Sequence, residues 1–191
     1  MKRKKNKKLP FTSGIRTKLV IFLSVVLVGG ILFIVVGLDL SRNRGQVSSI
    51  DFSFELESRM DGMARDYPIN SMVPYISKQD RAVAAFLVAI AKKESNWGKF
   101  SPKKDGRDCY NYWGYRGTYN QTESGYSCLD SPEQAVSVVG ERIGEFVSQK
   151  IDTPKKMAVA WKCGFDCSGH SFFSVKKWEW DVGYYYDKVY H

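Results

Sequence analysis

The first fifty residues almost lack acidic side chains, and the whole 191-residue chain has only two histidines. One of the 20 Asp and Glu residues, Asp39, falls in residues 1–50, against ten of the 29 Lys and Arg residues. Residues 51–191 therefore hold 19 residues of each sign, and the net charge of +9 belongs to the N-terminal segment. This distribution excludes a nucleic-acid-binding domain, because a basic binding face should lie on the folded part of the chain.

Charge is also missing from Leu19 to Leu38, a run of twenty mostly apolar residues. A helix of about 20 such residues matches the ~30 Å hydrocarbon core of a membrane. The basic residues 1–18 predict a cytoplasmic N-terminus by the positive-inside rule. A cleaved signal peptide is the alternative, but its apolar part is usually shorter and ends in small residues. We predict an uncleaved single-pass anchor in the cell membrane over 19–40, a stalk over 41–60 and an extracytoplasmic domain over 61–191.

Cysteine is scarce too, and all four cysteines follow the apolar run. An even number in an extracytoplasmic domain favours disulfides, and three pairings are possible. The local pairing, Cys109–Cys128 with Cys163–Cys167, is the one we expect. A zinc site from Cys163, Cys167 and His170 lacks an obvious fourth ligand, so we expect no metal and no other cofactor. A cysteine–histidine hydrolase has no recognisable nucleophile motif here.

A helix is predicted to begin near residues 77–80, whose Ser-Lys-Gln-Asp sequence can cap its first turn. An apolar stripe at helical spacing follows: Val83, Phe86, Leu87 and Ile90. The next position on that stripe is Glu94, close to Gly98 and Pro102, which should end the helix. Burial and the helix dipole would both raise the pKa of Glu94, as a general acid requires. The alternative is a helix-end Glu that faces water or pairs with a lysine.

Two short segments carry a resemblance. Residues 94–99, Glu-Ser-Asn-Trp-Gly-Lys, and 111–115, Asn-Tyr-Trp-Gly-Tyr, resemble the bacterial glucosaminidase family, which comprises peptidoglycan-cleaving autolysins related in fold to lysozymes and lytic transglycosylases. Trp113 stands where Phe is usual, and Phe100 where Ser is common. The resemblance extends in order over about residues 65–191, through 131–135, 153–161, Asp181 and 185–189.

The resemblance implies a mainly α (α+β), lysozyme-like helical domain with a small β or loop lobe. It also implies cleavage of β-1,4 bonds in the peptidoglycan glycan strand, with Glu94 as the catalytic acid. A lytic transglycosylase of the same fold and a catalytically silent glycan-binding module are the alternatives. An amidase or endopeptidase is disfavoured by the scarcity of histidine.

A second carboxylate is less certain from sequence. Its candidates, Asp105, Asp108 and Glu123, lie in the loop-rich segment 101–130, where Gly, Asn, Ser and Tyr predict turns or short strands. Glu123 is our first choice. If the N-acetyl group of the substrate assists the reaction, no second carboxylate is needed.

No Trp or Tyr precedes residue 51, whereas both residue types are frequent after it. Sugar rings stack on aromatic faces, and tyrosine hydroxyls bond sugar hydroxyls. Trp97 and Trp113 are also candidates for an apolar wall that keeps Glu94 protonated. We expect five residues to bind substrate: Trp97, Asn111, Tyr112, Trp113 and Tyr185.

Overall fold

The chain divides into two compact units, Met1–Ser48 and Ser49–His191. A computed structural model describes residues 26–27, 30–34, 36, 38 and 52–191. The predicted basic tail 1–18, most of the predicted membrane span 19–40 and residues 41–51 of the predicted stalk lie outside the described residues. Among the residues that are described, no helix has the length and apolarity needed to cross a membrane.

The second unit is mainly helical, as predicted. A helix over 52–64 opens it. The further elements are η1 (Pro68–Met72), α2 (Val73–Ile76), α3 (Arg81–Ser95), β1 (Lys103–Lys104), β2 (Arg107–Asp108), α4 (Pro132–Ser148), α5 (Pro154–Met157), the π-helical turn η2 (Ala158–Lys162) and α6 (Phe172–Tyr190).

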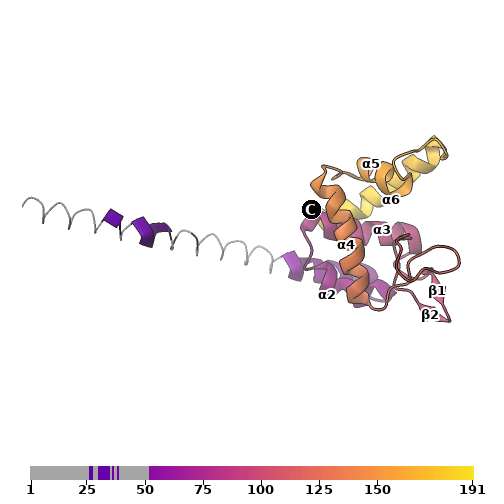
Figure 1. The fold of residues 1–191 in the computed structure, drawn as a ribbon, viewed down its shortest axis with the longest axis horizontal. Coiled ribbons are helices and arrows are strands. Elements are labelled where there is room, and N and C mark those ends of the chain that lie inside the picture. Colours follow the sequence, from indigo (N-terminus) through magenta and orange to yellow (C-terminus); the bar gives the residue numbers. More distant parts are fainter. Residues whose placement is uncertain (1–25, 28–29, 35, 37, 39–51) are drawn as a thin grey trace, which may run out of the picture. The chain divides into compact units, whose positions relative to one another are not determined.

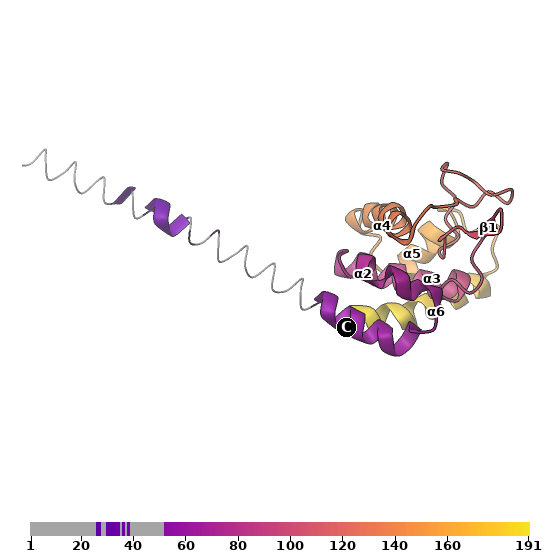
Figure 2. The ribbon, with the colours of Figure 1, turned by 90° about the horizontal axis from the view of Figure 1, so that it is seen from below.

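Helix α3 is the centre of this unit. It packs against α6 on one side and α4 on the other, and Figure 2 shows the three helices as successive layers. Every residue from Val83 to Ala91 is buried. The apolar stripe predicted for this helix is therefore only part of its buried surface, because neighbouring elements cover all of its faces in this stretch.

The ends of α3 follow from local chemistry, as predicted. The N-cap is Asp80, whose side chain accepts a hydrogen bond from the backbone N–H of Ala82 at 2.9 Å. The helix ends at Ser95, because Asn96 takes a left-handed conformation with φ of 49°. Glu94 is thus in the last turn.

The compact unit extends further toward the N-terminus than the boundary predicted at residue 61. The helix over 52–64 runs beside α6 (Figure 2) and places Phe52, Leu56 and Met60 in the core. Arg59 also donates a hydrogen bond from Nη1 to the Lys188 carbonyl oxygen at 2.6 Å. The last part of the predicted stalk is therefore a core helix.

Segment 101–130 forms the small lobe that the sequence predicts (Figure 1). Strands β1 and β2 pair antiparallel, and Asp105 and Gly106 join them with φ of 54° and 77°. Two consecutive positive φ angles are what a two-residue hairpin turn needs, and Asp-Gly supplies them at low cost. A single β-bridge between Gln121 and Ser127 holds the return of the chain.

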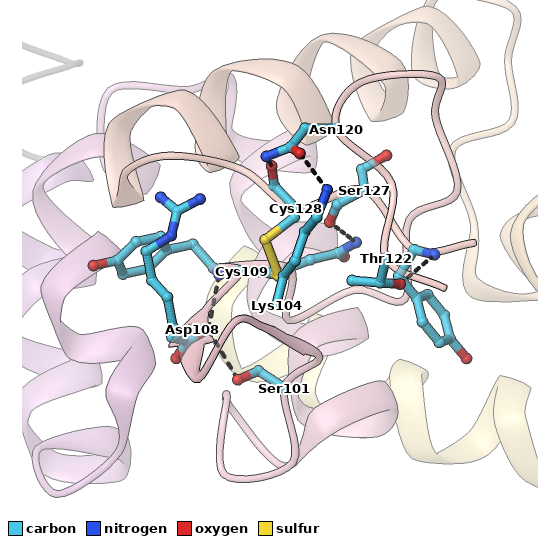
Figure 3. Close-up of a disulfide and its surroundings, with 12 residues drawn as sticks. Ser101, Lys104, Asp108, Cys109, Asn120, Thr122, Ser127 and Cys128 are labelled. Carbon is cyan, nitrogen blue, oxygen red and sulfur yellow. Dashed lines mark hydrogen bonds between the residues drawn. A yellow bond between two sulfur atoms is a disulfide. The ribbon is translucent and has the colours of Figure 1, made fainter. Parts of the chain in front are cut away.

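Both expected disulfides are present, Cys109–Cys128 and Cys163–Cys167. Figure 3 shows the first at the middle of the lobe, where the Asn120 side chain accepts a hydrogen bond from Lys104 Nζ at 2.6 Å and donates one to the Cys128 carbonyl oxygen at 3.1 Å. The alternative of a zinc site at Cys163 and Cys167 is wrong, since both sulfurs are in a disulfide.

Candidate active site

Glu94 stands at the wall of a hollow of about 250 Å³ between the end of α3 and the lobe. The hollow is lined by Glu94, Ser95, Phe100, Ser101, Pro102, Lys103, Asn111, Gly114, Ser124 and Tyr126. The side chain of Glu94 is exposed, so the burial predicted for it is wrong. The continuous buried stretch of α3 ends at Ala91, and the apolar stripe leaves the core before it reaches Glu94.

The carboxyl group of Glu94 is oriented by a single strong contact. Trp178 of α6 is buried, and its Nε1 donates a hydrogen bond to Glu94 Oε1 at 2.6 Å. Within residues 52–191, no group donates a hydrogen bond to Oε2. That oxygen lies 3.8 Å from the point where a Cβ on Gly114 would be. One oxygen is thus held by the protein, and the other is presented to the hollow beside a residue without a side chain.

The residues that follow Glu94 act as a rigid corner. Ser95 Oγ donates to the Tyr112 carbonyl oxygen at 2.8 Å and accepts from the Gly98 N–H at 2.9 Å. Trp97 Nε1 donates to the Val88 carbonyl oxygen at 2.9 Å. Gly98 has a φ of 92°, and a Cβ there would lie 2.8 Å from Tyr112 Cζ. The Ser, Trp and Gly of segment 94–98 therefore stabilise the corner, and of these three only Ser95 also lines the hollow beside Glu94.

The second predicted segment, 111–115, is anchored in a similar way. Asn111 is buried, and its Nδ2 donates to the carbonyl oxygens of Tyr115 at 2.7 Å and Ser127 at 2.8 Å. Its Oδ1 accepts from the Tyr115 N–H at 2.9 Å. Trp113 Nε1 donates to the Leu87 carbonyl oxygen at 2.7 Å. The Asn111 bonds hold the lobe together, and the Trp113 bond fastens it to α3, with Gly114 opposite Glu94.

Three of the aromatic residues predicted to bind substrate are in the core. Trp97, Tyr112 and Trp113 are exposed by only 2%, 1% and 0%. Their rings cannot stack on a sugar, so that role does not fit this structure. Burial, together with the nearby Asp108 carboxylate, raises the pKa of Tyr112, which keeps its hydroxyl neutral. Asn111 lines the hollow, but both of its amide N–H groups are donated to the backbone of the lobe, and its Oδ1 accepts a bond from that backbone.

Tyr185 borders a different hollow, which shares no lining residue with that of Glu94. Its other lining residues are Lys92, Lys93, Asn96 and Asp181. Lys93 Nζ bonds Asp181 Oδ2 at 2.6 Å and joins α3 to α6. Burial raises the pKa of Asp181, but hydrogen bonds from Lys177 and Lys93 outweigh it, so that the pKa is lowered overall. Tyr185 itself packs edge to face against the buried Trp97, with 5.3 Å between ring centres, and does not line the hollow of Glu94.

The acids of the lobe do not meet Glu94 in one hollow. Glu123 and Asp105 line a neighbouring hollow of about 400 Å³, which shares Lys103 and Ser124 with that of Glu94. Asp108 Oδ1 accepts hydrogen bonds from Ser101 Oγ at 2.9 Å and the Tyr110 N–H at 2.8 Å, so it braces a turn. In the described part of the chain, Glu94 is the only carboxylate that lines the central hollow.

Sequence reasoning missed three residues of the site. Trp178 is 84 positions from Glu94, and nothing local marks it as the partner of that carboxyl. Phe100 is 76% exposed at the hollow, where a sugar ring could stack. The sequence showed it only as an unusual residue at a position where Ser is common. Tyr126 lines the hollow from the return of the lobe, next to the bridged Ser127.

The comparisons with known proteins add no family. No family model matches the chain, and neither a curated protein nor a solved structure matches it. The resemblance to glucosaminidases therefore stays a prediction that rests on this chain's own residues.

Proposed function

We propose that the unit Ser49–His191 is a peptidoglycan glycosidase of the N-acetylglucosaminidase type, with Glu94 as its general acid. The observation that supports this most is the presentation of the carboxyl group, with Oε1 held by Trp178 and Oε2 open toward the hollow. General acid catalysis needs a proton donor within hydrogen-bond reach of the leaving oxygen and with a fixed direction.

In the proposed reaction, Glu94 Oε2 gives its proton to the glycosidic oxygen while the bond between that oxygen and the anomeric carbon breaks. A water molecule then adds to the anomeric carbon and loses a proton, which restores the enzyme and yields a reducing end. Gly114, which has no side chain, leaves room for the glycan strand beside the Glu94 carboxyl. The exposed ring of Phe100 offers a face on which a neighbouring sugar can stack.

A second candidate, a lytic transglycosylase, is favoured by the absence of another carboxylate around the central hollow in residues 52–191. In that reaction, the 6-hydroxyl of the sugar attacks its own anomeric carbon and returns its proton to Glu94. The product carries a 1,6-anhydro end, and no second carboxylate has to hold a water molecule.

We also propose that the apolar run 19–40 anchors this domain on the outer side of the cell membrane. The charge distribution supports this placement, because the basic residues 1–18 precede the run. Protease added to intact protoplasts should then remove the domain. A full-length protein protected from that protease would contradict the anchor.

The decisive experiment compares the full-length protein with Glu94→Gln on purified peptidoglycan. Gln keeps the size of the side chain and can still accept from Trp178, but it has no proton to transfer. Cleavage should fall by about 10²–10⁴-fold with unchanged glycan binding and circular dichroism. Glu141→Gln on α4, an exposed position, is the matched control.

The products decide between the two reactions. Reducing ends, with an additional loss in Glu123→Gln, identify a hydrolase, whereas 1,6-anhydro ends with full activity in Glu123→Gln identify a transglycosylase. Unchanged cleavage in Glu94→Gln would refute the assignment of the acid. A wild-type protein that binds peptidoglycan without cleaving it would be a silent binding module.

A further inference from the structure

A third hollow, of about 210 Å³, continues the central one past Gly114, which lines both. It is lined by Gly114, Tyr115, Arg116, Arg142, Phe146, Ala160 and Trp161. The hollow that holds Glu123 shares Lys103 and Ser124 with the central one, so the central hollow, which Glu94 lines, adjoins both of the others. We call these three adjoining hollows the groove.

The two ends of this groove differ in charge. At the Glu123 end, Lys103 and Lys104 are balanced by Asp105 and Glu123. At the other end, the lining residues include two arginines and no acid. We call this end the arginine hollow.

Arg116 is held in place without a carboxylate. Its Nη1 donates to the Ser124 carbonyl oxygen at 2.6 Å, and its guanidinium lies 4.0 Å from the ring centre of Tyr126. Within residues 52–191 it forms no ion pair. A guanidinium with one donor committed retains four N–H groups and its full charge for a ligand.

Arg142 lies over Phe146, with 4.2 Å between its guanidinium carbon and the ring centre. It pairs with Glu145 at 2.5 Å, but both side chains are about half exposed. An exposed pair of this kind is weak, so Arg142 can turn toward a ligand at little cost.

The floor of the arginine hollow is fixed relative to Glu94. Trp161 Nε1 donates to the Trp113 carbonyl oxygen at 3.2 Å, on the segment that places Gly114 opposite Glu94. Trp161 also stacks on Tyr115 with 6.3 Å between ring centres, and it contacts Phe146 edge to face. A ligand held by the two arginines would therefore lie at a set distance from the reacting bond.

We propose that the arginine hollow binds a carboxylate carried by a substituent of the glycan strand. This inference rests on the proposed function. Guanidinium groups bind carboxylates with two parallel hydrogen bonds, which gives both affinity and direction. In peptidoglycan, such a carboxylate comes from the lactyl group of N-acetylmuramic acid where it is free, or from the peptide attached to it. Because the arginine hollow lies at one end of the groove, a carboxylate bound there sets the direction in which the glycan strand lies across Glu94.

The test measures binding by full-length protein carrying Glu94→Gln, in detergent, so that no ligand is turned over. Three soluble ligands of equal sugar number are compared: a neutral chitooligosaccharide, peptide-free peptidoglycan strands with free lactyl carboxylates, and peptide-bearing strands. A carboxylate-bearing strand should bind about tenfold more tightly than the chitooligosaccharide, and added salt should shrink this ratio.

Arg116→Gln and, separately, Arg142→Gln should each remove most of that preference and leave chitooligosaccharide binding unchanged. Arg65→Gln is the matched control, since Arg65 is exposed and pairs with Asp61 on the helix over 52–64. Circular dichroism and thermal melting check that every variant is folded. Tight binding of peptide-free strands assigns the lactyl carboxylate, and tight binding of peptide-bearing strands alone assigns the peptide.

Equal affinity for all three ligands, with strands still cleaved by the wild type, would overturn this inference and leave the proposed function intact. An equal loss for every ligand in the arginine variants would overturn it as well. Conversely, an arginine-dependent preference in a wild-type protein that cleaves no strand would support the subsite and refute the glycosidase.

Discussion

The helical body, residues 52–100 and 131–191, and the lobe over 101–130 are stabilised by different kinds of interaction. The body has a continuous apolar core around α3, whose residues Val83–Ala91 are all buried. The lobe has two strands of two residues each, and its buried residues include Asn111, Thr122 and Ser127 as well as a disulfide. Packing fixes the body, whereas the lobe adds side-chain hydrogen bonds and a covalent link to the packing of its buried Tyr112 and Trp113 rings.

The body and the lobe contribute different parts of the candidate site. The body aims the Glu94 carboxyl, because Trp178 and the helix end both belong to it. The lobe supplies the facing wall, from Ser101 to Tyr126. Changes in the lobe should therefore alter the shape of the groove more than the acid itself, and changes in the body should do the reverse.

The largest effect on stability should come from the lobe disulfide. Cys109 and Cys128 close a loop with a sequence separation of 19, against 4 for Cys163 and Cys167. The chain-entropy model gives about 3 kcal/mol for the first and about 2 kcal/mol for the second. Chemical denaturation of the two double Cys→Ser variants checks the order. An equal loss in both would show that packing, and not closure, holds the lobe.

Gly98→Ala should break the junction between body and lobe. The new Cβ would meet Tyr112 Cζ at 2.8 Å in a backbone with a φ of 92°. We expect a loss of about 2–3 kcal/mol in the free energy of unfolding. Gly62→Ala is the control, since nothing lies within 4 Å of its Cβ position and it is in the helix over 52–64. That variant should gain stability by up to about 1 kcal/mol.

Trp178→Phe tests whether the body aims the acid. The ring is largely kept, but the hydrogen bond of 2.6 Å to Glu94 Oε1 is lost. The turnover number should fall by about 10–10²-fold, because a misdirected donor is costly, while KM and strand binding stay near wild type. A variant that loses binding in proportion to turnover would indicate a packing role for Trp178 instead.

The smallest effect should come from Asp181→Asn. Its folded pKa is lowered, so its contribution to stability is present above the unfolded pKa of about 3.8 and is lost as the pH falls through the folded value. Because the pair with Lys93 is partly exposed, we expect a cost of about 0.5–1 kcal/mol at pH 7. Melting curves at pH 7 and pH 3 should converge in acid. The control is Asp66→Asn, at an exposed position.

Features set by near neighbours in the chain could be predicted. The capped start of α3, its end before Pro102, the turns and short strands within 101–130 and both disulfides follow from residues a few positions apart or from a short loop. Glu94 therefore lies in the last turn of α3, as predicted, although the predicted burial of its side chain is wrong.

The aromatic residues show where such reasoning ends. In the sequence, nothing distinguishes Trp97 and Trp113 from tryptophans that bind sugars. In the structure, their indole N–H groups donate hydrogen bonds to the carbonyl oxygens of Val88 and Leu87 on α3. Composition predicts that aromatic rings contribute to the core or to sugar binding, but it does not show which of the two a given ring does. Phe100 is exposed at the hollow, but in the sequence it is marked only by its position, where Ser is common in the family that the chain resembles.

Apolar periodicity and short-range capping were thus enough to locate α3 and to place Glu94 in its last turn, whereas the mainly helical fold was expected only from the family resemblance. The packing of α6 against α3 was needed to bring Trp178 to Glu94 across 84 positions. The folding of the lobe was needed to bring Gly114 and the arginine hollow beside the same carboxyl. Contacts between distant segments depend on how whole elements pack together, and no local pattern in a chain encodes that packing.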